Sequence, residues 1–138
     1  MAELSLWAES SDLVDIRCFV EEAGRDLGLD DSSVYALQLA VDEACTNVIM
    51  HAYEGRGGRL DLYIDVVDDR IKVVIRDWGR AFDPSTIPAP DVDAPLEQRP
   101  IGGVGLFLMR QMMDRVDFQF SETDGNTLIM AKRLHRRE

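Results

Sequence analysis

The sequence predicts an α+β fold, a two-layer sandwich in which helices cover one face of a mixed, mostly antiparallel sheet. Short turns join consecutive strands, which favours antiparallel pairing. The strands alternate apolar and charged residues, so one face of the sheet is covered and the other is open. The chain has 138 residues, of which 46% are hydrophobic and 30% charged. This size and composition are typical of one globular domain, residues 1–138.

The first part of the chain is expected to form a strand and then two helices. Residues 3–8 alternate apolar and polar side chains, which predicts a short strand. Residues 10–12 offer N-cap chemistry for a helix that ends near Leu27, where Gly28 fits the C′ position. Residues 30–32 cap the second helix.

The second helix, which includes LQLAVDEACTNVIMHAY at residues 37–53, carries two lines of side chains. One is an apolar stripe expected in the core: Val34, Leu37, Val41, Ala44, Cys45, Val48 and Ala52. The other places Glu43, Asn47 and His51 four residues apart. The small residues Ala36 and Ala40 continue this second line and leave room for a ligand or another element. Taken alone, the line is either a solvated helix edge or one wall of a site.

Two alternating strands follow at residues 59–67 and 70–78, joined by a turn at Asp68 and Asp69. Asp77 shares the parity of the apolar residues in its strand, so it points under the helices. A buried carboxylate is costly without a partner, and no nearby basic residue shares this parity. A hydrogen-bond donor on a ligand is therefore a reasonable partner for Asp77.

The last third of the chain begins with a proline-rich stretch at residues 83–101, which holds all five prolines. Such a long loop in a compact domain is usually a lid or a binding loop. The sequence GGVG at residues 102–105 runs directly into a helical pattern. Free N–H groups at a helix start bind anions, and glycines allow phosphate to approach the backbone. A hairpin turning at residues 124–125 is expected to close the chain.

Composition excludes several classes of function. The formal net charge of −11 is unfavourable for binding nucleic acid and favours a basic protein partner. No run of about 18 apolar residues is present, which argues against a membrane span. The N-terminus does not resemble a secretory signal. Cys18 and Cys45 both lie in helical apolar patterns, so we expect reduced, buried thiols and a cytoplasmic protein.

Three motifs occur in a fixed order along these predicted elements. They are E-x-x-x-N at Glu43–Asn47, D-x-G-x-x-F at Asp77–Phe82 and G-G-x-G at Gly102–Gly105. Together they resemble the GHKL superfamily of ATPases and kinases, which has the Bergerat-type ATP-binding fold. The segments VDEACTNVIMHAY, RDWGRAFDP and GGVGLFLMRQMMD are similar to the small stand-alone serine kinases that act as anti-sigma factors. The resemblance extends over essentially the whole chain.

The resemblance implies roles for individual residues. The carboxylate matching Glu43 is the general base, and the amide matching Asn47 coordinates Mg²⁺. The aspartate matching Asp77 accepts a hydrogen bond from the adenine amine, and Gly79 lets the base approach the chain. The phosphates are held by the residues matching Gly102, Gly103, Val104 and Gly105, with residues 83–101 as the ATP lid.

Three further residues have alternative interpretations. Thr127 matches a threonine near the adenine pocket, although Asn126 separates it here from the preceding glycine. Arg17 matches an arginine that contacts protein partners in the family, and the alternative is a solvated helix arginine. His51 is interpreted as a helix-end histidine near the nucleotide pocket, with metal ligation as the alternative.

The expected function is that of an ATP- and Mg²⁺-dependent serine/threonine protein kinase of the anti-sigma type. It would phosphorylate an antagonist protein, sequester a sigma factor and form a homodimer, without contacting nucleic acid or membrane. Two alternatives stay open at this point. One is a binding module in which ATP only sets the conformation. The other is the catalytic domain of a split histidine kinase.

Overall fold

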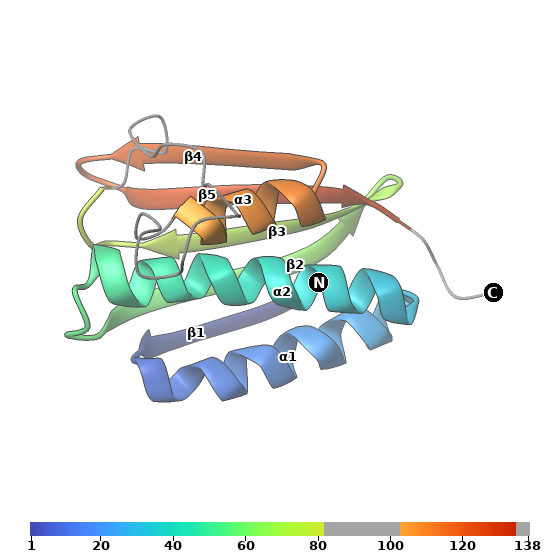
Figure 1. Ribbon diagram of the computed structural model, residues 1–138, viewed down its shortest axis with the longest axis horizontal. Helices are drawn as coiled ribbons and strands as arrows, with labels where there is room; N and C mark the ends of the chain where they lie inside the picture. Colours follow the sequence, from blue (N-terminus) through green and yellow to red (C-terminus); the bar gives the residue numbers. More distant parts are fainter. Residues whose placement is uncertain (82–102, 135–138) are drawn as a thin grey trace.

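The computed structural model describes residues 1–81 and 103–134, which form a sheet covered on one face by helices (Figure 1). The strands are β1 (Ala2–Ala8), β2 (Gly58–Val67), β3 (Arg70–Asp77), β4 (Arg115–Ser121) and β5 (Gly125–Arg133). The helices are α1 (Leu13–Asp26), α2 (Asp31–Asn47) and α3 (Gly103–Met112). A 3-10 turn (Ser10–Asp12) precedes α1, and a π-helical turn (Val48–Ala52) extends α2. The predicted order of elements is confirmed for the described residues.

Over the described residues, the sheet has five strands in the order β1-β2-β3-β5-β4. Each described pairing is antiparallel, so the expected mixed character is absent from this part of the chain. Asp68 and Asp69 form the turn between β2 and β3, with Asp68 in the left-handed conformation at a φ of 57°. The central pair β3 and β5 aligns Asp77 with Asn126. This register places both residues at one end of the sheet, on the same face.

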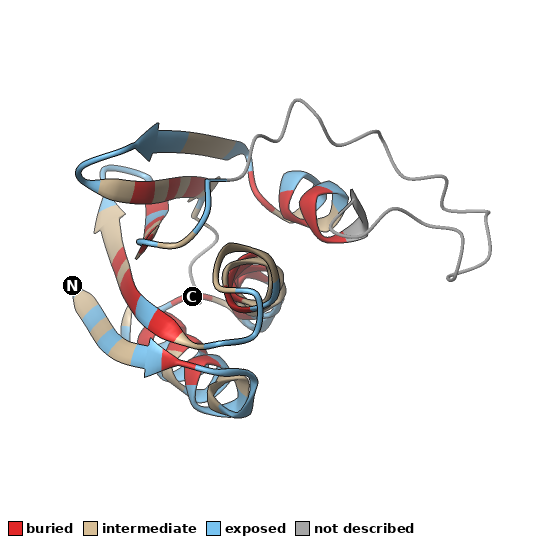
Figure 2. Cartoon of the chain, turned by 90° about the vertical axis from the view of Figure 1, so that its left-hand side faces the viewer, coloured by how far each residue is buried: buried red, intermediate tan, exposed pale blue. Residues whose placement is uncertain are grey.

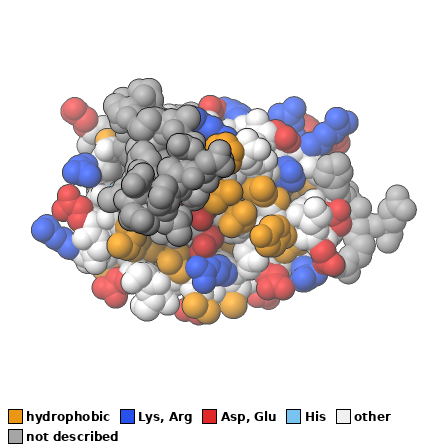
Figure 3. All heavy atoms as spheres, viewed as in Figure 1, with side chains coloured by type: hydrophobic (Ala, Val, Ile, Leu, Met, Phe, Trp, Pro, Cys, Tyr) orange, Lys and Arg blue, Asp and Glu red, His pale blue; other side chains and the backbone are white. Residues whose placement is uncertain are grey.

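The core lies between the sheet and the helices, where Figure 2 shows the buried residues. Helices α1 and α3 both pack against α2. The predicted alternation is confirmed in β3, where Ile71, Val73 and Ile75 are buried beneath the helices. On the helix-covered side, acidic and basic side chains surround a cluster of hydrophobic ones (Figure 3).

The end of α2 continues into a π-helical turn whose side chains are buried to different degrees. The Tyr53 N–H donates to the Val48 carbonyl, five residues back, so the turn is wider than an α-helical one. Ile49, four residues after the buried Cys45, is buried, with 1% of its surface exposed. Val48 and Ala52, which the helical spacing places in the core, are only half-buried. Val48 still packs against the core, as predicted, whereas Ala52 is not among the described residues of the core.

The two cysteines differ in their surroundings. Cys45 is buried in the core as expected, whereas Cys18 is exposed on α1, which corrects the prediction that both are buried. Both thiols are free. Among residues 1–81 and 103–134, no helix has the length and apolar character needed to cross a membrane. The predicted lid at residues 83–101 and the predicted site residue Gly102 lie outside the described residues.

Candidate functional site

A cavity opens where the end of β3 meets α2, α3 and the β4–β5 hairpin. Its walls come from elements that are distant in the sequence. The described lining residues are Ala44, Asn47, Val48, Ala52, Ile75, Asp77, Arg80, Met109, Phe118, Phe120, Asn126, Thr127 and Leu128. Most of this lining is apolar, with a few polar groups placed among it, as is usual for a small-molecule site. The partial exposure of Val48 and Ala52 is explained by their place in this wall.

Asp77 is the buried carboxylate of the cavity, with 6% of its surface exposed. Its Oδ1 accepts two hydrogen bonds, each 2.9 Å long, from the Asn126 Nδ2 and from the Gly79 backbone N–H. Burial raises the pKa of Asp77 above its ordinary value, and these two donors offset part of that rise. The sequence prediction that Asp77 points under the helices is confirmed. However, the protein itself supplies two hydrogen-bond donors to this carboxylate.

Gly79 is held against the end of the π-helical turn. A Cβ on Gly79 would lie 2.5 Å from the Ala52 carbonyl oxygen, closer than a side chain allows. The Arg80 N–H donates to this same carbonyl at 2.9 Å. The Tyr53 hydroxyl accepts a hydrogen bond from the Trp78 N–H at 2.8 Å, which links the end of β3 to the end of the π-helical turn. A side chain at position 79 would clash with the Ala52 backbone, which is a structural reason for a glycine here. It stands in addition to the predicted reason, the approach of a ligand.

Glu43, Asn47 and Gly105 meet where α3 begins. A Cβ on Gly105 would lie 2.9 Å from the Glu43 Oε2 and within 3.7 Å of both polar atoms of the Asn47 carboxamide. Glycine therefore lets the first turn of α3 approach the polar line of α2. The structure thus brings together the first and third motifs predicted from the sequence, and Asn47 also lines the cavity that holds Asp77.

The electrostatic surroundings of Glu43 favour a basic carboxylate. Partial burial is the main reason that its pKa is raised, and the negative charge of Asp42 adds to the rise. Among the described residues, no hydrogen bond or ion pair engages this carboxylate. The Asn47 Nδ2 is also buried and has no hydrogen-bond partner in the described part of the chain. Unpaired buried polar atoms are uncommon in folded proteins, and a bound ligand, ion or water is one way to satisfy them.

The donor set of this corner suits Mg²⁺, which the fold family implies. Mg²⁺ prefers carboxylate and amide oxygens, takes few protein ligands and keeps several waters. Asn47 offers an amide oxygen to a cation, and its Nδ2, which is unpaired among the described residues, is a donor that a phosphate oxygen can satisfy. The described residues hold no group of three or more His, Cys, Asp or Glu side chains that could form an all-protein metal cage. A cation bound jointly by Asn47 and phosphate oxygens fits these residues.

The remaining predicted residues take different places. Gly103 and Val104 open α3. Thr127 lines the cavity. His51 is half-buried and is not among the described residues that line the cavity.

Sequence reasoning missed Asn126, whose side chain reaches Asp77. The alternation along β5 could have found it. Asn126 shares the parity of the apolar residues Leu128 and Met130, so it faces the covered side.

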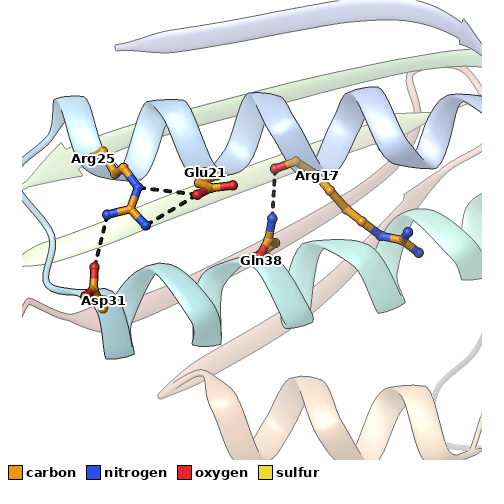
Figure 4. A network of polar contacts seen from close by, with 5 residues as sticks. All are labelled: Arg17, Glu21, Arg25, Asp31 and Gln38. Atoms are coloured by element: carbon orange, nitrogen blue, oxygen red, sulfur yellow. Dashed lines mark hydrogen bonds and ion pairs between the residues drawn. The ribbon is translucent and has the colours of Figure 1, made fainter.

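Arg17 on α1 forms an ion pair with Asp42, the residue that precedes Glu43. Its Nε donates to the Asp42 Oδ1 at 2.7 Å and its Nη2 to the Asp42 Oδ2 at 3.2 Å. The Gln38 Nε2 donates to the Arg17 carbonyl, in the seam of α1 and α2 shown in Figure 4. The Arg17 side chain keeps 46% of its surface exposed, so an approaching protein can still reach it.

Comparison with known proteins places these features in a family. A family model described as histidine kinase-like ATPase domain matches residues 6–132. The serine-protein kinase RsbW of Halalkalibacterium halodurans is 33% identical over 140 residues, which cover 99% of this chain and 85% of that protein. RsbW of Bacillus mycoides is 28% identical over 99% of this chain and 86% of its own length.

Solved structures agree with this fold. The RsbU and RsbW domains of a Mycobacterium tuberculosis protein match 99% of this chain and 34% of that chain, with a TM-score of 0.66 at 16% identity. The catalytic domain of the histidine kinase ThkA matches 97% of each chain, with a TM-score of 0.56 at 14% identity. The expected α+β fold of the GHKL type is thereby confirmed. The chain belongs to the histidine kinase-like ATPase family and, within it, to the serine-protein kinases related to RsbW.

Proposed function

We propose that this chain is an ATP- and Mg²⁺-dependent serine/threonine kinase that phosphorylates an antagonist protein and sequesters a sigma factor. One observation carries the proposal. A single corner of the fold joins the buried Asp77, the unpaired Asn47 amide and the glycine start of α3 beside Glu43. The kinship with proteins named serine-protein kinase RsbW supports the same reaction.

The adenine of ATP is assigned to the apolar cavity. Asp77 has one oxygen occupied by two N–H donors, so its other oxygen is available to accept from the exocyclic amine of the base. Apolar side chains from β3, α3 and β4 supply surfaces for the purine ring: Ile75, Met109 and Phe118. A polar acceptor placed among apolar walls is a common way to fix the orientation of a small ligand.

The phosphates and the transfer step are assigned to the corner where Glu43, Asn47 and Gly105 meet. Glu43 accepts the proton of the attacking serine hydroxyl, a role that its raised pKa favours. Asn47 holds Mg²⁺, which neutralises the charge on the phosphate oxygens when bound. The backbone N–H groups at the start of α3, with the predicted Gly102, hold the phosphates.

Partner binding is assigned to the surface around Arg17. This guanidinium is half-exposed and lies on α1, next to the α2 helix that carries Glu43. It can therefore bind a carboxylate of a docked protein while that protein presents a hydroxyl to the site. We also propose that the chain functions as a homodimer in the cytoplasm, as the resemblance implies.

The reaction is tested by transfer of radiolabelled phosphate from ATP to a candidate antagonist protein. Glu43→Gln should lose most of the transfer while it still binds ATP, because the change removes the base and keeps the shape. Phosphoserine should appear on the antagonist by mass spectrometry. ATP binding without any phosphoserine would instead support the binding module, and an acid-labile phosphohistidine on a helical partner would support the split histidine kinase.

Nucleotide binding is tested separately by thermal unfolding. ATP with Mg²⁺ at about 100 times its dissociation constant should stabilise the native protein by about 2.7 kcal/mol. Asp77→Asn should lose most of this stabilisation, because the acceptor oxygen opposite the adenine amine is replaced in part by a donor. An undiminished shift in Asp77→Asn would show that the adenine assignment is wrong.

A further inference from the structure

Asn126 is a buried carboxamide in the cavity wall, with 8% of its surface exposed. Its Nδ2 donates to the Asp77 Oδ1 at 2.9 Å and to the Gly79 carbonyl oxygen at 3.1 Å. The side chain comes from β5 and reaches across to the end of β3, because the register pairs Asn126 directly with Asp77. It therefore connects both residues of the Asp77–Gly79 segment that the proposed function uses.

The orientation of this carboxamide is fixed by its partners. Both are acceptors, so the amide nitrogen and not the amide oxygen must face them. The two N–H groups of Asn126 are used in this way, and the Asp77 Oδ1 also accepts from the Gly79 N–H at 2.9 Å. One carboxylate oxygen is thus saturated with donors. The polar atoms left over on these two side chains, the Asp77 Oδ2 and the Asn126 Oδ1, are both acceptors.

We propose that Asn126 is a positioning residue that makes the site select a purine with an amine, rather than a carbonyl, at C6. The proposal rests on the proposed function, in which Asp77 binds the base. An amine donates to the free Asp77 oxygen. A carbonyl in the same place would set an acceptor against the Asp77 oxygen, so the hydrogen bond from C6 to Asp77 is lost, which costs binding.

Asn126 acts by keeping the carboxylate ionised and in one orientation. A hydrogen bond to the charged form of a carboxylate favours that form. Without the amide donor, the Asp77 Oδ1 keeps only the Gly79 N–H, so Asp77 is less firmly held and more readily protonated. A protonated carboxyl donates to a carbonyl. Selectivity for the amine then falls even though Asp77 itself is unchanged.

The test compares the affinities of the 138-residue chain for ATP and ITP. ATP has an amine at C6 and an unprotonated N1, whereas ITP has a carbonyl at C6 and a hydrogen on N1. Both are measured with Mg²⁺ by competition against a fluorescent ATP analogue. Asn126→Asp keeps the shape but removes the amide donors, and two carboxyl groups so close together retain a shared proton. Asn126→Ala removes the group altogether. Gln119→Glu is the matched control, an amide-to-acid change at an exposed position of the neighbouring strand β4.

We expect the wild-type protein to prefer ATP over ITP by about 100-fold, and both Asn126 variants to lower this ratio at least about tenfold. Gln119→Glu should keep the wild-type ratio. The two affinities are measured on the same sample, so a partly unfolded variant affects both equally and the ratio still reports the site.

Three outcomes would overturn the inference. An ATP preference that survives in both Asn126 variants would overturn it alone and leave the proposed function standing. A similar fall in Gln119→Glu would show a general effect of added charge. A wild-type protein that binds neither nucleotide would overturn the inference together with the proposed function.

Discussion

Replacing Gly105 by alanine should slow phosphoryl transfer without unfolding the protein. The added Cβ would lie 2.9 Å from the Glu43 Oε2, whereas ordinary contacts begin at 3.4 Å. The atom it meets is the far end of a flexible side chain, so Glu43 moves and the backbone does not. The carboxylate must shift by about 0.5 Å or more to restore a normal contact.

The size of the effect follows from this displacement. Misplacing a catalytic group by about 1 Å can cost about 100-fold in rate, so half of that shift should cost about tenfold. Stability should stay level or rise by up to about 1 kcal/mol, because alanine is a better helix residue than glycine. A rate loss without a stability loss therefore distinguishes displacement of Glu43 from general damage.

The assay is single-turnover transfer of radiolabelled phosphate to a candidate antagonist, with unfolding in urea measured on the same samples. Gly24→Ala is the matched control, a glycine-to-alanine change inside α1, where the new Cβ would lie 3.1 Å from the Val34 Cγ2. This control should keep the wild-type rate. A Gly105→Ala protein that transfers phosphate at the wild-type rate would refute the argument that this contact sets the position of Glu43.

Three other predictions follow from the same structure. Gly79→Ala should lower the unfolding free energy by about 1–3 kcal/mol in urea, because its Cβ would lie 2.5 Å from a backbone oxygen; unchanged stability would contradict that packing. Iodoacetamide at neutral pH should label the exposed Cys18 in the native protein and spare Cys45, because burial raises the pKa of the Cys45 thiol to about 12. Peptide mass spectrometry measures the labelling, and equal reaction of both thiols would contradict the burial of Cys45. Burial and the Asp42 charge raise the pKa of Glu43, which must be ionised to act as a base, so the rate should fall with decreasing pH earlier than for an ordinary glutamate. Asp42→Asn should move this limb of the pH–rate profile to lower pH, and a limb that stays in place would exclude the coupling.

The sequence predicts the strands and the place of Asp77 because side chains alternate strictly along a strand. Counting from the apolar residues of β3 is enough to place Asp77 under the helices, where it is 6% exposed. Helical spacing is a poorer guide to burial at the end of α2, where a π-helical turn follows and Val48 and Ala52 are only half-buried. Neither Val48 nor Ala52 carries a local signal for that wider turn.

The partner of Asp77 is harder to find from the sequence. Alternation places Asn126 on the covered face, but only the register of β3 with β5 brings it opposite Asp77. That register depends on packing between segments nearly 50 residues apart, and the hydrogen bond joins residues 49 positions apart. The exposure of Cys18, by contrast, could have been predicted from helical spacing, because it lies on the face opposite Ile16 and Val20, which are buried.

The two carboxylates of the site differ in ways that separate their roles. Burial raises the pKa of both Glu43 and Asp77. Asp77 also accepts two N–H donors, which hold the charged form and make it a fixed acceptor. Glu43 has no such donor among the described residues, and a neighbouring negative charge further favours its uptake of a proton. When two carboxylates of one site have environments that differ in this way, one can bind the ligand and the other can transfer the proton.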